Sequence, residues 1–298
     1  MKLTNLIILI LEMLTILQAS DLQLIEGDIE INYPKSSRQL AHYTLNVLQA
    51  ANPEYTTVFG PDHEPIKFRI FNSQENFLRE TAAWLPNWAN AVTLFPQKIV
   101  LIKTPDLNQL TLREYRRAVR HELVHLRQGS IVPLNLTPAW FNEGVAVYLT
   151  GESHLTDRIL LSRAITQNRI IPLTEISDFL KYNRQQVSLA YIESTTVIEF
   201  LVQVYGFEVL PNLFRQLSQN RSFEQSLFLT IGIGIGELDS FWQKYILKRY
   251  RWIFLLDIQN LIWLILPLLV VFVYFIKVAR NKTIIQKWNN EETVSLIK

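Results

Sequence analysis

The chain has 298 residues, of which 49% are hydrophobic, and this is enough apolar material for a sizeable buried core. Its 29 basic and 27 acidic residues leave a net charge of only +2, without a block of like charge long enough to follow a nucleic-acid backbone, so DNA and RNA are excluded as partners. The absence of cysteine excludes disulfide frameworks, thiolate nucleophiles and cysteine metal sites.

The N-terminal segment, residues 1–20, has the pattern of a secretory signal. Lys2 precedes an apolar run from Leu6 to Leu17, and small residues at the end of the segment predict cleavage near position 20. Glu12 interrupts the apolar run, which leaves an uncleaved N-terminal anchor as the alternative. Since a basic residue precedes the run and acidic residues follow it, we expect the chain after it to be exported.

Residues 253–276 are predicted to form a transmembrane helix. The stretch from Leu261 to Ile276 is uncharged, and with the residues leading into it the run approaches the roughly 20 residues that a bilayer core requires. A buried core helix is the alternative. Basic residues flank the run on both sides, so the positive-inside rule alone does not decide the orientation. The predicted export of the chain after residue 20 decides it. We expect a single-pass cell-membrane protein with residues 21–252 outside the cytoplasm, periplasmic or extracellular, and a cytoplasmic tail at 277–298.

The exported part is predicted to be an α+β domain, with an α/β part at 21–110 and a helical part at 111–252. Apolar residues alternate with polar ones in "IKFRIF", which predicts a strand, and "KIVLIK" is predicted to be another. Helical periodicity dominates from Thr111 onward. "GIGIG" lacks the Lys-Ser/Thr pair of a phosphate loop, so we interpret it as a turn between helices. The predicted strands are 66–71 and 98–103, and the predicted helices are 38–50 (ended by "NPEY"), 73–83 (N-cap Ser73), 111–129, 137–151, 155–167, 187–205, 208–219 and 237–251.

The stretch "HELVH" lies on one of these helices. Thr111 and Glu114 form a capping box at its start, and Gly129 is the predicted stop. Positions four apart lie on the same face of a helix, so His121 and His125 can present their imidazoles to one ion. Both are absent from the predicted core stripe, which comprises Leu112, Tyr115, Val119, Leu123 and Leu126.

A catalytic zinc site takes three protein ligands, so HExxH needs a third. Position 131, where some metallopeptidase families carry a third histidine, is Ile, and His154 lacks motif context. Glu143 is the better candidate, because a short connection lets the next helix fold back beside the first. The alternative for Glu143 is a surface acid near a helix N-terminus. In the helix that contains Glu143, Thr137 is the predicted N-cap and Pro138 the first helical residue.

Together, "HELVHLRQG" and "PAWFNEGVAVYLTG" resemble the gluzincin metallopeptidases, in particular the peptidase MA-like domains, over roughly residues 40–247. The resemblance implies a zincin-like, thermolysin-like fold and a Zn²⁺-dependent peptidase with a peptide or protein as substrate. It implies His121, His125 and Glu143 as zinc ligands and Glu122 as general base and proton shuttle. It also implies an edge strand for the substrate, either "KIVLIK" or the preceding "AVTLF".

The chain departs from this pattern at one position. Thermolysin-type members carry an acid four residues after the ligand Glu, which supports a ligand histidine, whereas this chain has Val147. Tyr191 is the candidate donor to the oxyanion, with a core aromatic as its alternative, and Tyr148 is a second candidate.

Three other functions compete with that of a zinc peptidase. A catalytically inactive zincin-fold binding or chaperone-like module at the membrane has no need of Glu122. An intramembrane protease is disfavoured by five arginines on the motif helix, because each would be costly in lipid. Hydrolysis of a substrate other than a peptide stays open. No feature of the sequence indicates the cleavage preference or the oligomeric state.

Overall fold

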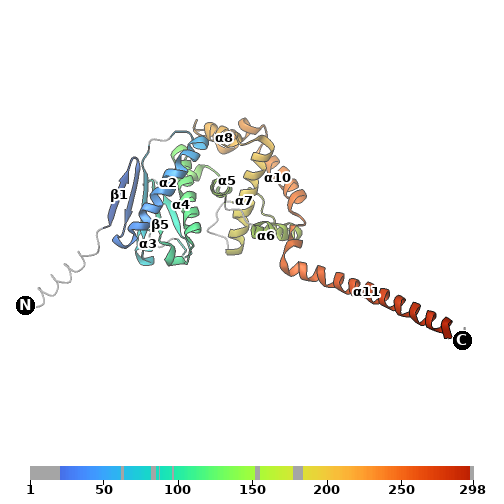
Figure 1. Cartoon of the computed structure of the whole chain (residues 1–298). Helices are drawn as coiled ribbons and strands as arrows, with labels where there is room; N and C mark the ends of the chain where they lie inside the picture. The colour runs from blue at the N-terminus through green and yellow to red at the C-terminus, as the bar shows by residue number, and fades with distance from the viewer. Residues whose placement is uncertain are drawn as a thin grey trace, which may run out of the picture. The chain divides into compact units, whose positions relative to one another are not determined.

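The computed structural model describes residues 21–61, 64–81, 85–86, 88–95, 97–151, 155–176 and 184–295. The predicted signal segment 1–20 and His154 lie outside these residues. The described chain is a mixed α+β protein with one five-stranded sheet (Figure 1). The predicted α+β class is therefore confirmed.

The sheet is mixed and has the strand order β1-β2-β3-β5-β4. Strands β2, β3 and β5 run parallel, while β1 and β4 pair antiparallel at the two edges. The prediction located β3 and β5 but not the two N-terminal strands. The strands are β1 (Leu22–Glu26), β2 (Ile29–Tyr33), β3 (Ile66–Phe71), β4 (Ala91–Leu94) and β5 (Ile99–Lys103). Because β5 pairs on both sides, "AVTLF" rather than "KIVLIK" supplies the edge strand.

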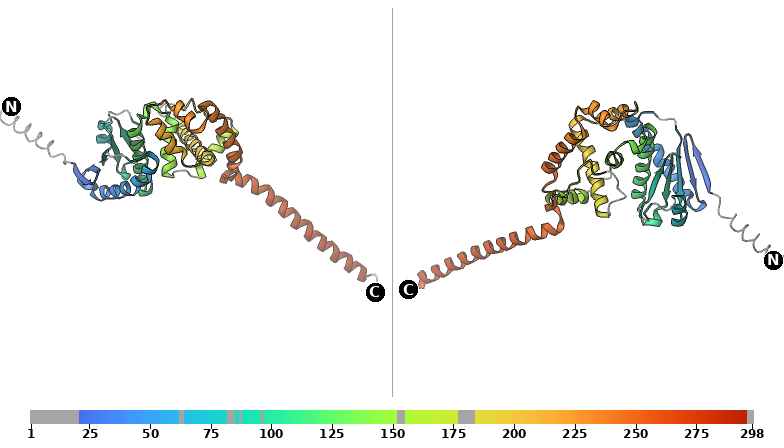
Figure 2. Two further views of the ribbon diagram at one scale, coloured as in Figure 1. Left: turned by 90° about the horizontal axis from the view of Figure 1, so that it is seen from above. Right: turned by 180° about the vertical axis from the view of Figure 1, so that it is seen from behind.

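The alternation within the strands assigns each side chain to a face of the sheet. Phe68 of β3, Val100 of β5 and Thr93 of β4 are directly paired across the strands and share one face. Helices α2 (Arg38–Phe59) and α4 (Leu112–Ile131) pack on the sheet, and Figure 2 shows both helices alongside it. Leu101, Val92 and Leu94 instead pack around Phe77 of α3 (Gln74–Glu80). The strands thus have buried side chains on both faces.

Helix α2 continues nine residues past its predicted end at position 50. Pro53 lies inside the helix, although a proline there removes one backbone hydrogen bond. The tertiary contacts of the last turns offset this loss: Tyr55 and Val58 are buried, and Asn52 accepts two hydrogen bonds from Arg127 of α4, at 2.7 and 3.0 Å. The prediction of a stop at "NPEY" was wrong because it considered the local sequence alone.

The caps of the other helices confirm most of the predicted boundaries. The Ser73 side chain accepts from the Asn76 amide, and Thr111 and Glu114 form the capping box. Gly151 ends α5 (Ala139–Thr150) in the left-handed region, at φ 68°. "GIGIG" lies between α9 (Phe223–Ile231) and α10 (Ile235–Tyr250), so it joins two helices as predicted. The remaining helices of this part are α7 (Arg184–Tyr205) and α8 (Val209–Leu217).

Two further predicted boundaries, the end of α4 and the N-cap of the next helix, were wrong. Helix α4 does not stop at Gly129 but runs to Ile131, and Gly129 instead makes room for the ring of Phe95, which follows β4. Pro138 rather than Thr137 is the N-cap of α5. The Thr137 hydroxyl donates instead to the side chain of Asn142 at 2.6 Å, and it lies 3.1 Å from the backbone oxygen of Leu134.

The chain divides into two compact units, Met1–His154 with Ile170–Ile246, and Leu155–Arg169 with Leu247–Lys298. In the second unit the Ser162 hydroxyl of α6 (Leu155–Thr166) donates to the Arg251 carbonyl at 3.0 Å and accepts from the Phe254 amide at 2.8 Å. The predicted start of a helix at 253 was wrong, because Ile253–Leu256 form a 3-10 turn. An α-helix, α11 (Ile258–Ser295), follows it.

Candidate metal centre

The HELVH stretch lies in the middle of α4, on the face that the predicted core stripe leaves free. Tyr115, Val119, Leu123 and Leu126 are buried, so the stripe is confirmed at these positions. Leu112 is 57% exposed, because it is the first residue of the helix and lies outside the packed part. The His121 and His125 rings meet edge to face at a centroid distance of 4.7 Å.

Helix α5 brings Glu143 to the two histidines. The turn of Leu134–Leu136 reverses the chain, so that α5 packs against α4. On its other side α5 packs closely on α7, because Gly144 leaves no side chain between its backbone and that of Ser194. The close approach that Gly144 permits is therefore to α7. Glu143 is thus placed by the packing of three helices.

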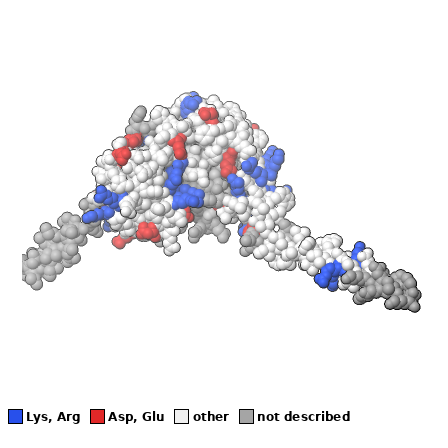
Figure 3. Space-filling model, viewed as in Figure 1, with Lys and Arg blue, Asp and Glu red and all other residues white. Residues whose placement is uncertain are grey.

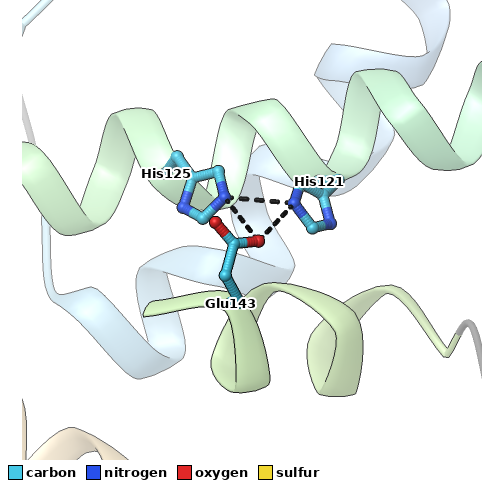
Figure 4. Close-up of side chains that lie close together, drawn as sticks. All are labelled: His121, His125 and Glu143. Atoms are coloured by element: carbon cyan, nitrogen blue, oxygen red, sulfur yellow. Dashed lines mark hydrogen bonds and ion pairs between the residues drawn. The ribbon is translucent and has the colours of Figure 1, made fainter. Parts of the chain in front are cut away.

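The three side chains converge on one point (Figure 4). The two histidine Nε2 atoms are 3.0 Å apart, and the Glu143 Oε2 atom lies 3.3 Å from that of His121 and 3.5 Å from that of His125. Tetrahedral coordination with Zn–N and Zn–O bonds of about 2.0–2.1 Å requires ligand atoms about 3.3 Å apart. The residues therefore fit a tetrahedral zinc ion with one position left for a further ligand.

The electrostatics of Glu143 favour a cation at this point. Burial by itself raises the pKa of Glu143, but the charge of His125 and hydrogen bonds from His121 and His125 outweigh it and hold the pKa well below its usual range. The carboxylate is therefore ionised at neutral pH. An anionic oxygen beside two imidazole nitrogens is the donor set that zinc takes in proteins.

Glu122 lies beside this group but is not part of it. Among the described residues, the convergent set of metal-binding side chains comprises His121, His125 and Glu143. Glu122 is 9% exposed, and its Oε2 accepts a hydrogen bond of 2.7 Å from the Thr93 hydroxyl of β4. The same hydroxyl lies 3.3 Å from the Glu122 backbone oxygen. The edge strand therefore holds a buried carboxylate next to the candidate ligands.

Two residues that the sequence analysis does not identify make contacts with residues of HELVH. Thr93 is one, and the other is Gln128, whose Oε1 lies 3.0 Å from the His125 Nδ1. The spacing of three between His125 and Gln128 is a helical signal that could have located Gln128. No local signal connects Thr93 to Glu122, because 29 residues separate them.

The structure places the two candidate oxyanion donors on neighbouring helices. Tyr191 lies on α7, which packs against α5, and is partly buried. Tyr148 lies on α5, where burial and the nearby charge of Glu199 raise its pKa. On α7 an apolar stripe at helical spacing is buried, and it comprises Val187, Ala190, Ser194, Ile198 and Leu201. The role of Tyr191 stays a prediction.

Comparison with known proteins agrees with the geometry of the site. The family model of the peptidase MA superfamily matches residues 55–248, which contain β3, the edge strand β4 and the helices α4, α5 and α7. A search of curated proteins finds no match. The matched region covers more than half of the chain and includes the three convergent side chains. The chain therefore belongs to the peptidase MA superfamily.

Proposed function

We propose that this chain is a membrane-anchored zinc metallopeptidase of the gluzincin type with a zincin-like fold, which hydrolyses peptide bonds outside the cytoplasm. The observation that carries the proposal is the convergence of His121, His125 and Glu143, with the buried carboxylate of Glu122 directly after the first ligand. Family membership indicates a metallopeptidase, and the donor set supports zinc as its metal.

In this proposal, different residues of the chain hold the metal, transfer the proton and stabilise the developing negative charge. The two histidines and Glu143 would hold the zinc, which when bound would supply a Lewis acid for the scissile carbonyl and a water that is nucleophilic at neutral pH. Glu122 removes the proton of the attacking water and passes it to the leaving amine. Tyr191 donates a hydrogen bond to the oxygen on which negative charge develops.

Strand β4 is the proposed binding site for the peptide backbone. In the described part of the chain β4 pairs on one side only, with β5. Both of its faces are occupied, because Val92 and Leu94 pack on the Phe77 cluster and Thr93 contacts Glu122. An extended peptide can therefore add only at the free edge, where backbone groups are available for hydrogen bonds.

Helix α11 supports a membrane anchor. Among the residues that the structure describes, two helices are long and apolar enough to cross a bilayer, Gln186–Tyr205 and Leu261–Gln286. The first lies in α7, where most of the apolar stripe is buried in the core, so we assign the span to the second, with a mean hydropathy of 2.6. Figure 3 shows its early part as a surface of uncharged residues that Lys and Arg side chains then follow. Its apolar side chains, such as Leu268 and Phe272, are exposed.

The test of this function compares the full-length chain in detergent micelles with Glu122→Gln and His125→Ala. We expect about one zinc per chain in the wild type and in Glu122→Gln, and loss of zinc in His125→Ala. Hydrolysis of a peptide library should fall by about 10²–10⁴-fold in Glu122→Gln, because the general base is lost. Equal hydrolysis in that variant would contradict the mechanism. A zinc-loaded wild type without chelator-sensitive hydrolysis would favour the inactive binding module.

A further inference from the structure

Gln128 lies on α4, and its side chain connects this helix with α5. It lies one turn after His125 on α4, and its side chain is completely buried. Its Oε1 is 3.0 Å from His125 Nδ1, and its Nε2 donates to the backbone oxygen of Asn142 at 3.3 Å. Asn142 directly precedes Glu143, so one amide connects the second histidine to the peptide next to the carboxylate ligand.

The contact with Asn142 fixes which way the amide points. A backbone carbonyl can only accept a hydrogen bond, so the amide nitrogen of Gln128 must face Asn142 and its oxygen must face His125. That oxygen can also only accept, so the proton of His125 is on Nδ1. The lone pair of the ring is then on Nε2, the atom that faces His121 and Glu143.

The opposite orientation would disable the site. If the amide nitrogen faced His125, Nδ1 would have to accept, and the neutral ring would carry its proton on Nε2. This proton would point to the place where the three ligand atoms converge, and a protonated nitrogen cannot bind a cation. A buried amide has no water with which to exchange partners, so its two contacts decide the tautomer.

Asn142 is itself held in place from the preceding turn. Its Nδ2 donates to the Leu134 carbonyl at 2.9 Å, and its Oδ1 accepts from the Thr137 hydroxyl at 2.6 Å. The series His125, Gln128, Asn142, Thr137 therefore runs from the metal ligand to the turn that joins α4 and α5. It provides support to a ligand histidine in a chain where Val147 replaces the acid of thermolysin-type members.

We propose that Gln128 is a positioning residue that holds His125 in its Nδ1-protonated tautomer and so prepares Nε2 to bind zinc. This inference rests on the proposed zinc site and deepens it. Ligand histidines in zinc proteins donate their second ring N–H to an outer partner, and loss of that partner reduces metal affinity by about 10–100-fold. Here the partner is a neutral amide on the same helix.

The first test measures zinc affinity by competition with a chelator in the full-length chain. Gln128→Met keeps the length of the side chain and removes both hydrogen bonds, and we expect its zinc affinity to fall by about 10–100-fold. Gln128→Glu keeps an acceptor for His125 Nδ1, and we expect its affinity to stay within about threefold of the wild type. Gln49→Met, at an exposed glutamine of α2, is the matched control and should not change the affinity.

The second test needs neither zinc nor activity. Nitrogen-15 chemical shifts of labelled histidine distinguish the two neutral tautomers in the metal-free protein, and His125→Ala assigns the signal. We expect the Nδ1–H form in the wild type and in Gln128→Glu, and a shift toward Nε2–H in Gln128→Met. A wild-type affinity and tautomer in Gln128→Met would overturn the proposal, as would an equal loss in Gln128→Glu. A protein that hydrolyses no peptide would refute the proposed function and leave both readouts intact.

Discussion

Gly144 allows a sharp test of how α5 places Glu143. The substitution Gly144→Ala adds one carbon, which would lie 2.8 Å from the carbonyl carbon of Ser194, still closer to its oxygen, and 2.9 Å from Cγ1 of Ile198. Ordinary contact begins at 3.4 Å, so α5 and α7 must move apart by at least 0.6 Å. Backbone atoms of α7 cannot rotate away as a flexible side chain would.

The expected cost follows from two opposing effects. Overpacking typically costs about 1–3 kcal/mol, whereas replacing glycine by alanine within a helix contributes up to about 1 kcal/mol. Because the closest atoms belong to the backbone of α7, the overpacking cost should lie in the upper part of its range, about 2–3 kcal/mol. We therefore expect the free energy of unfolding of Gly144→Ala to be lower by about 1–2 kcal/mol. Zinc sites tolerate displacements of about 0.2 Å, so a shift of this size at the residue next to Glu143 should also weaken zinc binding at least about tenfold.

The assay is urea unfolding of the metal-free full-length chain in detergent micelles, together with chelator competition for zinc. Gly236→Ala is the matched control, because an added carbon there meets no atom within 4 Å. It should leave zinc affinity unchanged and stability equal or slightly higher. The reasoning is refuted if Gly144→Ala is as stable as the wild type. It is also refuted if the variant loses stability but keeps wild-type zinc affinity.

Three further predictions concern the base, a buried acid and the membrane topology. Thr93→Val removes the hydroxyl that donates to Glu122, so kcat should fall about tenfold, which corresponds to about 1.4 kcal/mol, with KM and zinc content unchanged. Thr93→Ser keeps the hydroxyl and should retain the wild-type kcat, whereas a wild-type kcat in Thr93→Val would disprove the role of this contact. Burial raises the pKa of Glu193 to about 9, against the opposing hydrogen bond from the Ile171 amide, and the charge of Asp239 raises it further. The folded state then keeps a proton that the unfolded state loses, so the unfolding free energy should fall by up to about 1.4 kcal/mol per pH unit as pH rises from about 4.5 to 9. The fall should be smaller in Glu193→Gln, and equal slopes in urea titrations of the two proteins would contradict this prediction. Since the chain has no cysteine, the single substitutions Gln49→Cys and Thr283→Cys can each be labelled in intact cells with a membrane-impermeant maleimide. Only the cysteine at position 49 should react, and the reverse pattern would invert the proposed topology.

The sequence by itself determined what depends on spacing within one element. The helical period put His121 and His125 on one face of α4, alternation of apolar and polar residues located β3, and a short apolar run located β5. The capping box at Thr111 and the left-handed Gly151 mark helix ends because their hydrogen bonds and dihedral angles involve neighbours only. These features are local, so no knowledge of packing was needed to predict them.

Only the tertiary structure decided which distant residues meet. The passage of α2 through Pro53, the edge position of β4 and the contact of Thr93 with Glu122 all depend on partners far away in the chain. The same is true of the link from Gln128 to Asn142, which no period within α4 encodes. Hydrogen bonds and close approaches between elements form when packing brings the elements together, so the pattern of each element alone cannot specify them.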